Sequence, residues 1–277
     1  MQDKIIISRL MVYCNHGVFE EEKINGQNFY VSAEIYLDTS KAGHTDNLDY
    51  SVNYAEICML ITEFMQFNNF DLIETVAENL SVHILEFSPL IKGVKIRIDK
   101  PEAPIMLPFE TVAVEIERKW HTAFIGLGGN IGDTMTIINE AIEKIRETDG
   151  IYVVKESAMV MTEPYGGVPQ NNFLNSVIEI KTYHNPYKLL DIFNQYEAEA
   201  GRVRDIHWGP RTLDIDIIMY DEEVIHDERL IIPHVDMQNR IFVLEPLNEL
   251  APYAYNPVTG KTVGQMLKEL NEAESWG

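Results

Sequence analysis

The sequence predicts an α+β protein, and its length, the order of its elements and its junction support this. The chain has 277 residues, 45% of them hydrophobic, and domains commonly hold about 100–150 residues, which suggests two domains. In the first part, strand and helix patterns come in blocks rather than in strict alternation, which is typical of an antiparallel sheet with helices on one face. One predicted strand follows another across residues 117–122 without a Gly-rich or Pro-rich linker. We expect domains at 1–119 and 120–277.

Hydrophobic periodicity predicts six elements in the first part. Val94, Ile96 and Ile98 alternate with polar residues, which indicates a half-buried strand. Asn53 lies three residues before Glu56, as in a capping box at a helix start. The predicted elements are strands at 5–13 and 29–37, helices beginning at Asn53 and at 72–85, and strands at 94–98 and 111–116.

The second part mixes strands and helices in the same way. Asp133 is a good N-cap for a helix whose apolar residues include Ile138 and Ile142. The predicted elements are strands at 123–127, 151–161 and 172–180, a helix at 189–200, and short helices near 241–249 and 263–270.

Charge and cysteine content limit the partners. The formal net charge is −22, which argues against nucleic acid and anionic membranes, since both attract basic surfaces. We see no signal peptide and no apolar run long enough to span a membrane. Cys14 and Cys58 are expected to be reduced thiols. We expect a cytoplasmic protein.

Residues 201–217 combine arginines with two alternating aspartates. Asp214 and Asp216 stand at i and i+2 of a predicted strand, so their side chains point the same way. Magnesium prefers oxygen ligands and is often shared with phosphates, which arginines also bind. The stretch is typical of a magnesium–polyphosphate site. The alternative is an ion-paired strand edge in which Arg204 and Arg211 neutralise the aspartates.

Two residues of the first part could carry chemistry. Lys100 ends a strand before Pro101 and could donate a proton if it is partly desolvated; the alternative is an ordinary solvated lysine. Glu74 opens a helix, where the helix dipole alone would favour its charge. The histidines of this part lack the spacing of a zinc site.

Residues 1–119 resemble bacterial dihydroneopterin aldolases. The resemblance rests on short motifs in matching order: His16-Gly17, Gly26-Gln27, Thr45-Asp46-Asn47, Val52-Asn53-Tyr54, Leu72-Ile73-Glu74 and Lys100-Pro101. It implies a tunnelling fold that assembles into homo-oligomeric rings with active sites between subunits. Glu74 would then bind the pterin, and Glu22, Val52, Tyr54 and Ile73 would also line the pocket. Lys100, Tyr54 and Glu22 would serve the retro-aldol step, which needs no metal or other cofactor.

Residues 120–277 resemble hydroxymethyldihydropterin pyrophosphokinases. The motifs are Gly128-Gly129-Asn130, Thr162-Glu163-Pro164-Tyr165-Gly166, Phe173-Leu174-Asn175, Gly201-Arg202-Val203-Arg204, the run from Trp208 to Asp216, and Pro233-His234. The resemblance implies a ferredoxin-like α+β core. It also implies transfer of a pyrophosphoryl group from ATP to the pterin's hydroxymethyl oxygen, with release of AMP.

The same resemblance assigns roles in the second part. Asp214 and Asp216 would hold two Mg²⁺ ions, with Arg202 and Arg211 acting in catalysis. Pterin contacts would come from Thr162, Pro164, Tyr165, Phe173, Asn175 and Phe242. ATP contacts would come from Glu197, Arg202, Arg204, Trp208, Arg211, Ile217, His234 and Arg240. Residues 205–210 would close as a lid. Without the resemblance, Phe173 and Phe242 would be interpreted as core aromatics.

Two positions depart from that family, and two rival functions stay open. Gly129 stands where relatives usually have serine, and His207 where many have arginine. An epimerase-type or inactive first domain is one alternative, and a pterin-sensing or nucleotide-sensing half is another. We predict a bifunctional folate-pathway enzyme whose substrates are 7,8-dihydroneopterin and ATP.

Overall fold

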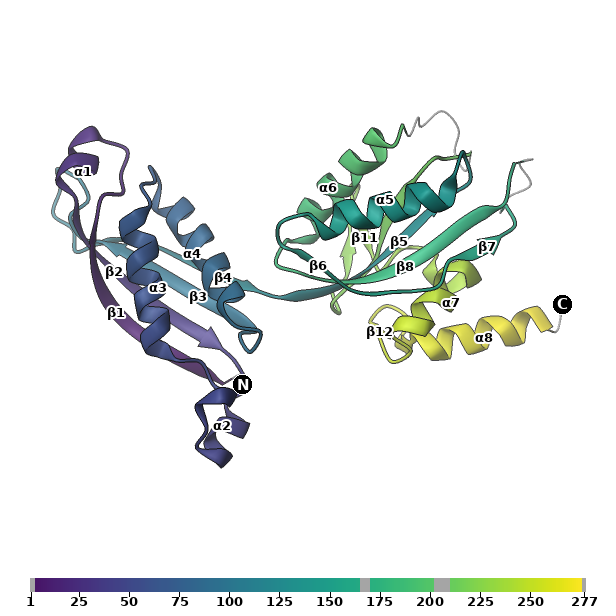
Figure 1. The fold of residues 1–277 in the computed structure, drawn as a ribbon, viewed down its shortest axis with the longest axis horizontal. Coiled ribbons are helices and arrows are strands. Elements are labelled where there is room, and N and C mark those ends of the chain that lie inside the picture. The colour runs from purple at the N-terminus through teal and green to yellow at the C-terminus, as the bar shows by residue number, and fades with distance from the viewer. Residues whose placement is uncertain (1–2, 165–169, 202–209, 276–277) are drawn as a thin grey trace. The chain divides into compact units, whose positions relative to one another are not determined.

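The computed structural model describes residues 3–164, 170–201 and 210–275. The chain forms two compact units, Met1–Trp120 and His121–Gly277. Each unit is an α+β structure built on its own antiparallel sheet (Figure 1).

The first unit is a four-stranded sheet covered by two long helices. The strands pair in the order β1-β2-β3-β4, so β1 and β4 form the edges. Helix α3 packs on β1, and α4 packs on β3 and β4. The elements are β1 (Lys4–Cys14), α1 (Glu20–Asn25), β2 (Gln27–Tyr36), α2 (Ser40–Thr45), the 3-10 turn η1 (Leu48–Tyr50), α3 (Tyr54–Phe67), α4 (Ile73–Phe87), β3 (Gly93–Lys100) and β4 (Val112–Lys119).

Alternation and capping explain these elements. Every second residue of β2 is buried from Gln27 to Ile35, because one face of the sheet lies under the helices. The predicted cap of α3 is confirmed: the Asn53 side chain accepts the Ala55 N–H at 3.0 Å and donates to Glu56 at 2.8 Å. The predicted order of two strands, two helices and two strands is confirmed, with α1, α2 and η1 added in the connections.

The second unit is a five-stranded sheet with helices on both faces. The order is β6-β8-β5-β9, and β7 also pairs with β8. Helices α5 and α6 bury one face of the sheet, and α7 and α8 bury the other. The elements are β5 (His121–Gly129), α5 (Thr134–Arg146), β6 (Ile151–Glu156), β7 (Val160–Thr162), β8 (Phe173–Thr182), α6 (Pro186–Glu199), β9 (Asp214–Tyr220), β10 (Ile225–His226), β11 (Ile231–Ile232), η2 (Met237–Asn239), α7 (Ile241–Leu250), β12 (Tyr255–Asn256), β13 (Lys261–Thr262) and α8 (Val263–Ser275).

One strand prediction was wrong in detail. The apolar run at 151–161 forms two strands, β6 and β7, that both pair with β8. The break falls at Ser157, whose hydroxyl accepts the Val177 N–H at 2.9 Å and whose own N–H donates to the Val177 carbonyl at 2.9 Å. Because a side chain takes the place of a ladder bond there, pairing is interrupted.

None of the helices within residues 3–164, 170–201 and 210–275 is both long and apolar enough to cross a bilayer.

Candidate functional site

Lys100 and Glu22 form a nearly buried ion pair in the first unit. The Lys100 Nζ lies 2.6 Å from Glu22 Oε1, and the two side chains are 10% and 9% exposed. Lys100 is the last residue of β3, and Glu22 lies in the first turn of α1. A paired lysine and carboxylate shielded from water can exchange protons with a substrate placed beside them.

The groups around Glu22 keep it ionised. Burial raises the pKa of Glu22, but the hydrogen bonds from Lys100 and from the Phe19 N–H outweigh it, so the pKa lies below its usual value. The Gln27 amide also donates to Glu22 Oε1 at 3.3 Å. Gln27 is buried, and it was not among the site residues predicted from the sequence.

His16 links this ion pair to the start of α4. The His16 ring is 1% exposed, and its Nδ1 accepts the Phe70 N–H at 3.1 Å. The His16 carbonyl accepts a hydrogen bond from Lys100 Nζ at 3.4 Å. Lys23 of α1 also binds Asp71 at 2.7 Å. These contacts bring the N-terminal end of α4, with Ile73 and Glu74, towards the Lys100–Glu22 pair.

Acid should weaken the first unit through His16. Burial, helped by the charge of Lys100, lowers the pKa of His16 to about 4. The unfolded chain would therefore bind the proton first, so stability is retained above about pH 6.5 and lost as pH falls towards 4. We expect a loss of about 3 kcal/mol over that window.

This pH effect can be measured by native-state hydrogen exchange of β1 in the wild type and in His16→Asn. Asparagine can still accept the Phe70 N–H, but it does not titrate. The stabilities of the two proteins should diverge below pH 6.5, and parallel curves would contradict the assignment.

Val52 and Tyr54 lie at the other end of the first unit. Tyr54 begins α3, whereas Phe70 and Asp71 follow its last residue. A 14-residue helix is about 20 Å long, because each residue adds about 1.5 Å. Figure 1 accordingly shows α1 and α2 at opposite ends of this unit. Within one chain, the predicted residues thus form two groups: Glu22, Ile73, Glu74 and Lys100 in one, and Val52 and Tyr54 in the other.

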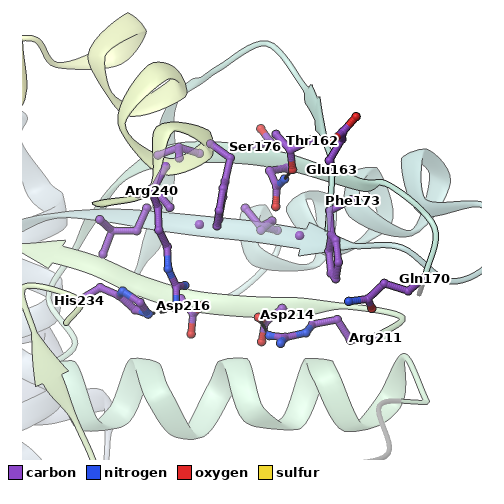
Figure 2. A pocket seen from close by; sticks show the side chains of 18 residues that line it. Thr162, Glu163, Gln170, Phe173, Ser176, Arg211, Asp214, Asp216, His234 and Arg240 are labelled. Atoms are coloured by element: carbon purple, nitrogen blue, oxygen red, sulfur yellow. Dashed lines mark hydrogen bonds and ion pairs between the residues drawn. The ribbon is translucent and has the colours of Figure 1, made fainter. Parts of the chain in front are cut away.

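The second unit contains a cavity of about 120 Å³ over β5, β8 and β9. Figure 2 shows Asp214 and Asp216 side by side on β9, with Arg211 at one end of the pair and His234 and Arg240 at the other. The lining residues include Gly126, Leu127, Gly128, Thr162, Glu163, Gln170, Phe173, Asn175, Ser176, Val177, Arg211, Asp214, Asp216, Ile218, His234, Arg240, Phe242 and Val243.

The two aspartates project into this cavity because β9 alternates. Ile215 and Ile217 are buried in the core under α5 and α6, so the residues at 214 and 216 face the opposite side. Asp214 forms an ion pair with Arg211, and its side chain is 15% exposed; that of Asp216 is 48% exposed. Two carboxylates on one face suit a hard divalent cation that completes its coordination with phosphate oxygens.

His234 and Arg240 complete the charged end of the cavity. His234 Nε2 lies 3.9 Å from Asp216 Oδ2. Burial first and then Arg240 lower the pKa of His234, against the effects of Asp236 and Asp214. A neutral His234 at pH 7 would act as a hydrogen-bonding group rather than as a cation. Arg240 binds Asp236 at 3.2 Å, and its guanidinium lies 5.8 Å from the centre of the Phe242 ring.

The other end of the cavity can hold a flat polar ring. Phe173 and Phe242 both line the cavity, with Phe242 beside Arg240, so neither is only a core aromatic. Asn175 donates from Nδ2 to the Thr162 hydroxyl at 2.9 Å. A side chain at Gly128 would place its Cβ 2.7 Å from Asn175 Oδ1. The Asn175 amide is thus oriented by Thr162 and has room because residue 128 is glycine.

Several predicted ATP residues lie elsewhere. Glu197 is 4% exposed, and its Oε1 accepts the Ile215 N–H at 2.7 Å, which fixes the edge strand β9 to α6. Ile217 is buried in the core, and Pro164 and Glu197 are not among the residues that line the cavity. The predictions for Tyr165, Arg202, Arg204, His207 and Trp208, and the lid at 205–210, lie almost wholly outside the described residues.

Gly129 has a steric role rather than a polar one. A Cβ at this position would lie 2.5 Å from the Thr212 carbonyl oxygen, closer than real contacts allow. The glycine therefore permits residues 211–212 to approach the end of β5. The departure from serine at this position therefore concerns the approach of residues 211–212 and not only a polar contact.

Sequence reasoning missed residues whose contacts are long-range. His16, Gln27, Gln170 and Ser176 border the two clusters. The motif His16-Gly17 marked the first of these without showing what it touches. Ser176 carries no local signal, because it is one of several polar residues along β8 and no motif marks it.

Comparisons with known proteins agree with this division. A family model described as dihydroneopterin aldolase matches residues 5–117. A second, described as 7,8-dihydro-6-hydroxymethylpterin-pyrophosphokinase, matches residues 124–252.

Individual relatives cover either one unit or both. The 2-amino-4-hydroxy-6-hydroxymethyldihydropteridine pyrophosphokinase of Bacillus subtilis is 41% identical over 143 residues, which are 52% of this chain and 86% of that protein. The folic acid synthesis protein fol1 of Pneumocystis carinii is 29% identical over 98% of this chain, which spans 38% of its length. The solved E. coli dihydroneopterin aldolase in complex with neopterin is 28% identical, with a TM-score of 0.39, over 42% of this chain and 98% of that one.

The chain belongs to the 7,8-dihydro-6-hydroxymethylpterin-pyrophosphokinase family through its second unit and carries a dihydroneopterin aldolase domain as its first, so it is a bifunctional enzyme of folate biosynthesis, a lyase joined to a transferase.

Proposed function

We propose that the cavity over β9 binds Mg-ATP and 6-hydroxymethyl-7,8-dihydropterin side by side. The observation that carries this is the Asp214–Asp216 pair on one face of a strand, with Arg211 at one end and His234 and Arg240 at the other (Figure 2). Carboxylates and cations side by side suit a metal-bound polyphosphate, which carries both kinds of charge.

Asp214 and Asp216 would hold two Mg²⁺ ions. When bound, these ions would neutralise the charge of the phosphates. Arg211 and Arg240 would bind the phosphates of ATP. The ion pair between Arg211 and Asp214 would be exchanged for these partners when the substrate enters.

The pterin would occupy the end of the cavity near Phe173. The aromatic rings of Phe173 and Phe242 would stack on its faces. Asn175, oriented by Thr162, would read its edge with one donor and one acceptor. Its hydroxymethyl oxygen would then attack the β-phosphorus and release its proton to solvent. The bond between that phosphorus and the oxygen of the α-phosphate would break, and AMP would leave with that oxygen.

The first unit would cleave 7,8-dihydroneopterin at the Lys100–Glu22 pair. Glu74 would anchor the pterin through a charge-assisted hydrogen-bonded pair. The pair would accept the proton of the side-chain hydroxyl as the carbon–carbon bond breaks, and glycolaldehyde would leave. The electrons would pass into the protonated imine of the substrate's own ring, and a returned proton would complete the hydroxymethyl product.

Assembly of several copies would complete this aldolase site. Val52 and Tyr54 lie about 20 Å from the start of α4 along the α3 axis, so a neighbouring chain would have to supply them. The sheet has two edge strands, β1 and β4. These strands carry exposed apolar side chains such as Ile6, Met11 and Val112. Open edges of this kind pair readily with another copy.

Mixing two inactive variants should restore aldolase activity. In a mixture of Lys100→Ala and Tyr54→Phe chains, about a quarter of shared sites would combine both wild-type groups if assembly is random. We expect glycolaldehyde release to recover towards that fraction after the chains are unfolded and refolded together. Each variant unfolded and refolded alone serves as a control. If glycolaldehyde release does not recover in the mixture, the site is not shared between chains.

One assay tests both activities. The protein is incubated with 7,8-dihydroneopterin, with and without Mg-ATP, and glycolaldehyde and AMP are followed. Glycolaldehyde without AMP would refute the kinase proposal. AMP only when hydroxymethyldihydropterin is supplied would refute the aldolase proposal. An epimerase-type or inactive first unit would leave the substrate's carbon chain intact.

A further inference from the structure

Asn130 is a buried amide between the two segments that border the cavity. It follows β5 directly and is 4% exposed. Its Nδ2 donates to Gln170 Oε1 and to the Asn171 carbonyl, both at 3.1 Å. Its Oδ1 accepts the Arg211 N–H at 2.9 Å. These three side-chain hydrogen bonds all lead to residues that line the cavity or lie next to its lining.

The backbone of Asn130 strengthens the link to Arg211. The Asn130 N–H donates to the Arg211 carbonyl at 2.9 Å, so residues 130 and 211 are joined in both directions. Gly129 permits this, because a Cβ there would collide with the neighbouring Thr212 carbonyl. Arg211 is thus held by its main chain, and its side chain is left to face Asp214 (Figure 2).

We propose that Asn130 is a positioning residue for pyrophosphoryl transfer, which sets the spacing between the pterin side and the phosphate side of the cavity. This inference rests on the function proposed for the second unit. Gln170 and Asn171 lead into Phe173, on the pterin side. Arg211 leads into Asp214, on the phosphate side. One buried amide would therefore hold both sides of the cavity at a fixed spacing. The reacting atoms of the two substrates must lie in line, and small displacements from that geometry lower the rate.

The two ends of the Asn130 amide can be tested separately. Asn130→Asp keeps the shape and the acceptor for the Arg211 N–H. It removes both donated bonds and sets a carboxylate oxygen against the Asn171 carbonyl, which cannot turn away as a side chain could. Asn130→Ala removes all three side-chain bonds. Gln170→Ala removes a single partner and leaves the bond to Asn171.

Asn256 provides a matched control in the same unit. It is 1% exposed, its Oδ1 accepts the Val258 N–H at 2.9 Å, and its Nδ2 contacts the Met237 sulfur at 3.4 Å. It is not among the lining residues of the cavity. Asn256→Asp therefore makes the same chemical change at a buried asparagine that has no proposed link to substrate.

The test measures kcat, KM for each substrate and Tm for all four variants, using full-length protein and AMP release. We expect Asn130→Asp to raise KM for hydroxymethyldihydropterin about tenfold, the effect of one unsatisfied buried group, with KM for Mg-ATP within about twofold. Asn130→Ala should raise both KM values and lower kcat. Gln170→Ala should change the pterin KM in the same direction by less. Asn256→Asp should change Tm alone.

Two outcomes would overturn the inference, and both differ from failure of the proposed function. The first outcome is that the Asn130 variants and Gln170→Ala keep the wild-type values of kcat and of both KM values. The second outcome is that Asn130→Asp raises KM for both substrates equally and lowers Tm as Asn256→Asp does. Asn130 would then have a structural role only. A wild-type protein that releases no AMP would refute the proposed function itself, and this inference with it.

Discussion

Asp216→Ala should lower AMP release at least about 1,000-fold while glycolaldehyde release stays unchanged, because metal-bound phosphates contribute several kcal/mol of transition-state stabilisation. The Asp216 side chain is 48% exposed and lies 3.9 Å from His234, so its removal takes little packing from the fold. The two activities are measured on the same preparation, with hydroxymethyldihydropterin supplied for the second.

Controls separate the loss of charge from the loss of structure. Asp216→Asn keeps the size of the side chain and removes its charge, so it should be nearly as inactive as Asp216→Ala. Asp191 lies on α6, with a 61% exposed side chain paired to Arg229, and Asp191→Ala should leave both activities intact. If Asp216→Ala retains a tenth of the AMP release, the aspartate pair does not hold the metal. If both activities fall, the two units do not act independently.

The strand that carries these aspartates could be predicted because its signal is local. Alternation in β9 and β2, and the caps at Asn53 and Asp133, depend on neighbours within four residues. Such signals determine which face of an element is buried and where it starts. For this reason the two sheets and most helix positions follow from the sequence.

Other features depend on contacts between distant residues. The break between β6 and β7 is caused by Ser157 binding Val177, 20 residues away. His16 meets Phe70, 54 residues away, and Asn130 meets Arg211, 81 residues away. The separation of Tyr54 from Lys100 follows from the length and placement of α3. Periodicity carries no information about such pairs, because many long-range pairings satisfy one hydrophobic pattern.

Lys100→Met should lower glycolaldehyde release by about 10²–10⁴-fold, the usual contribution of a positioned acid or base. AMP release from supplied hydroxymethyldihydropterin should be unaffected. The change also leaves Glu22 without its ion-pair partner, and the Glu22 side chain is 9% exposed and 2.6 Å from the lysine. Breaking such a pair by removing one partner can cost about 3–5 kcal/mol, so lost activity alone could reflect an unstable first unit.

The double variant Lys100→Met/Glu22→Gln resolves this ambiguity. Glutamine keeps the shape of Glu22 and leaves no unpaired charge, so stability should return towards that of the wild type. If Lys100 and Glu22 carry the proton transfers, the double variant stays inactive although it is folded, as urea unfolding would show. Activity that returns together with stability would mean that the pair only supports the fold and that the retro-aldol step uses other groups.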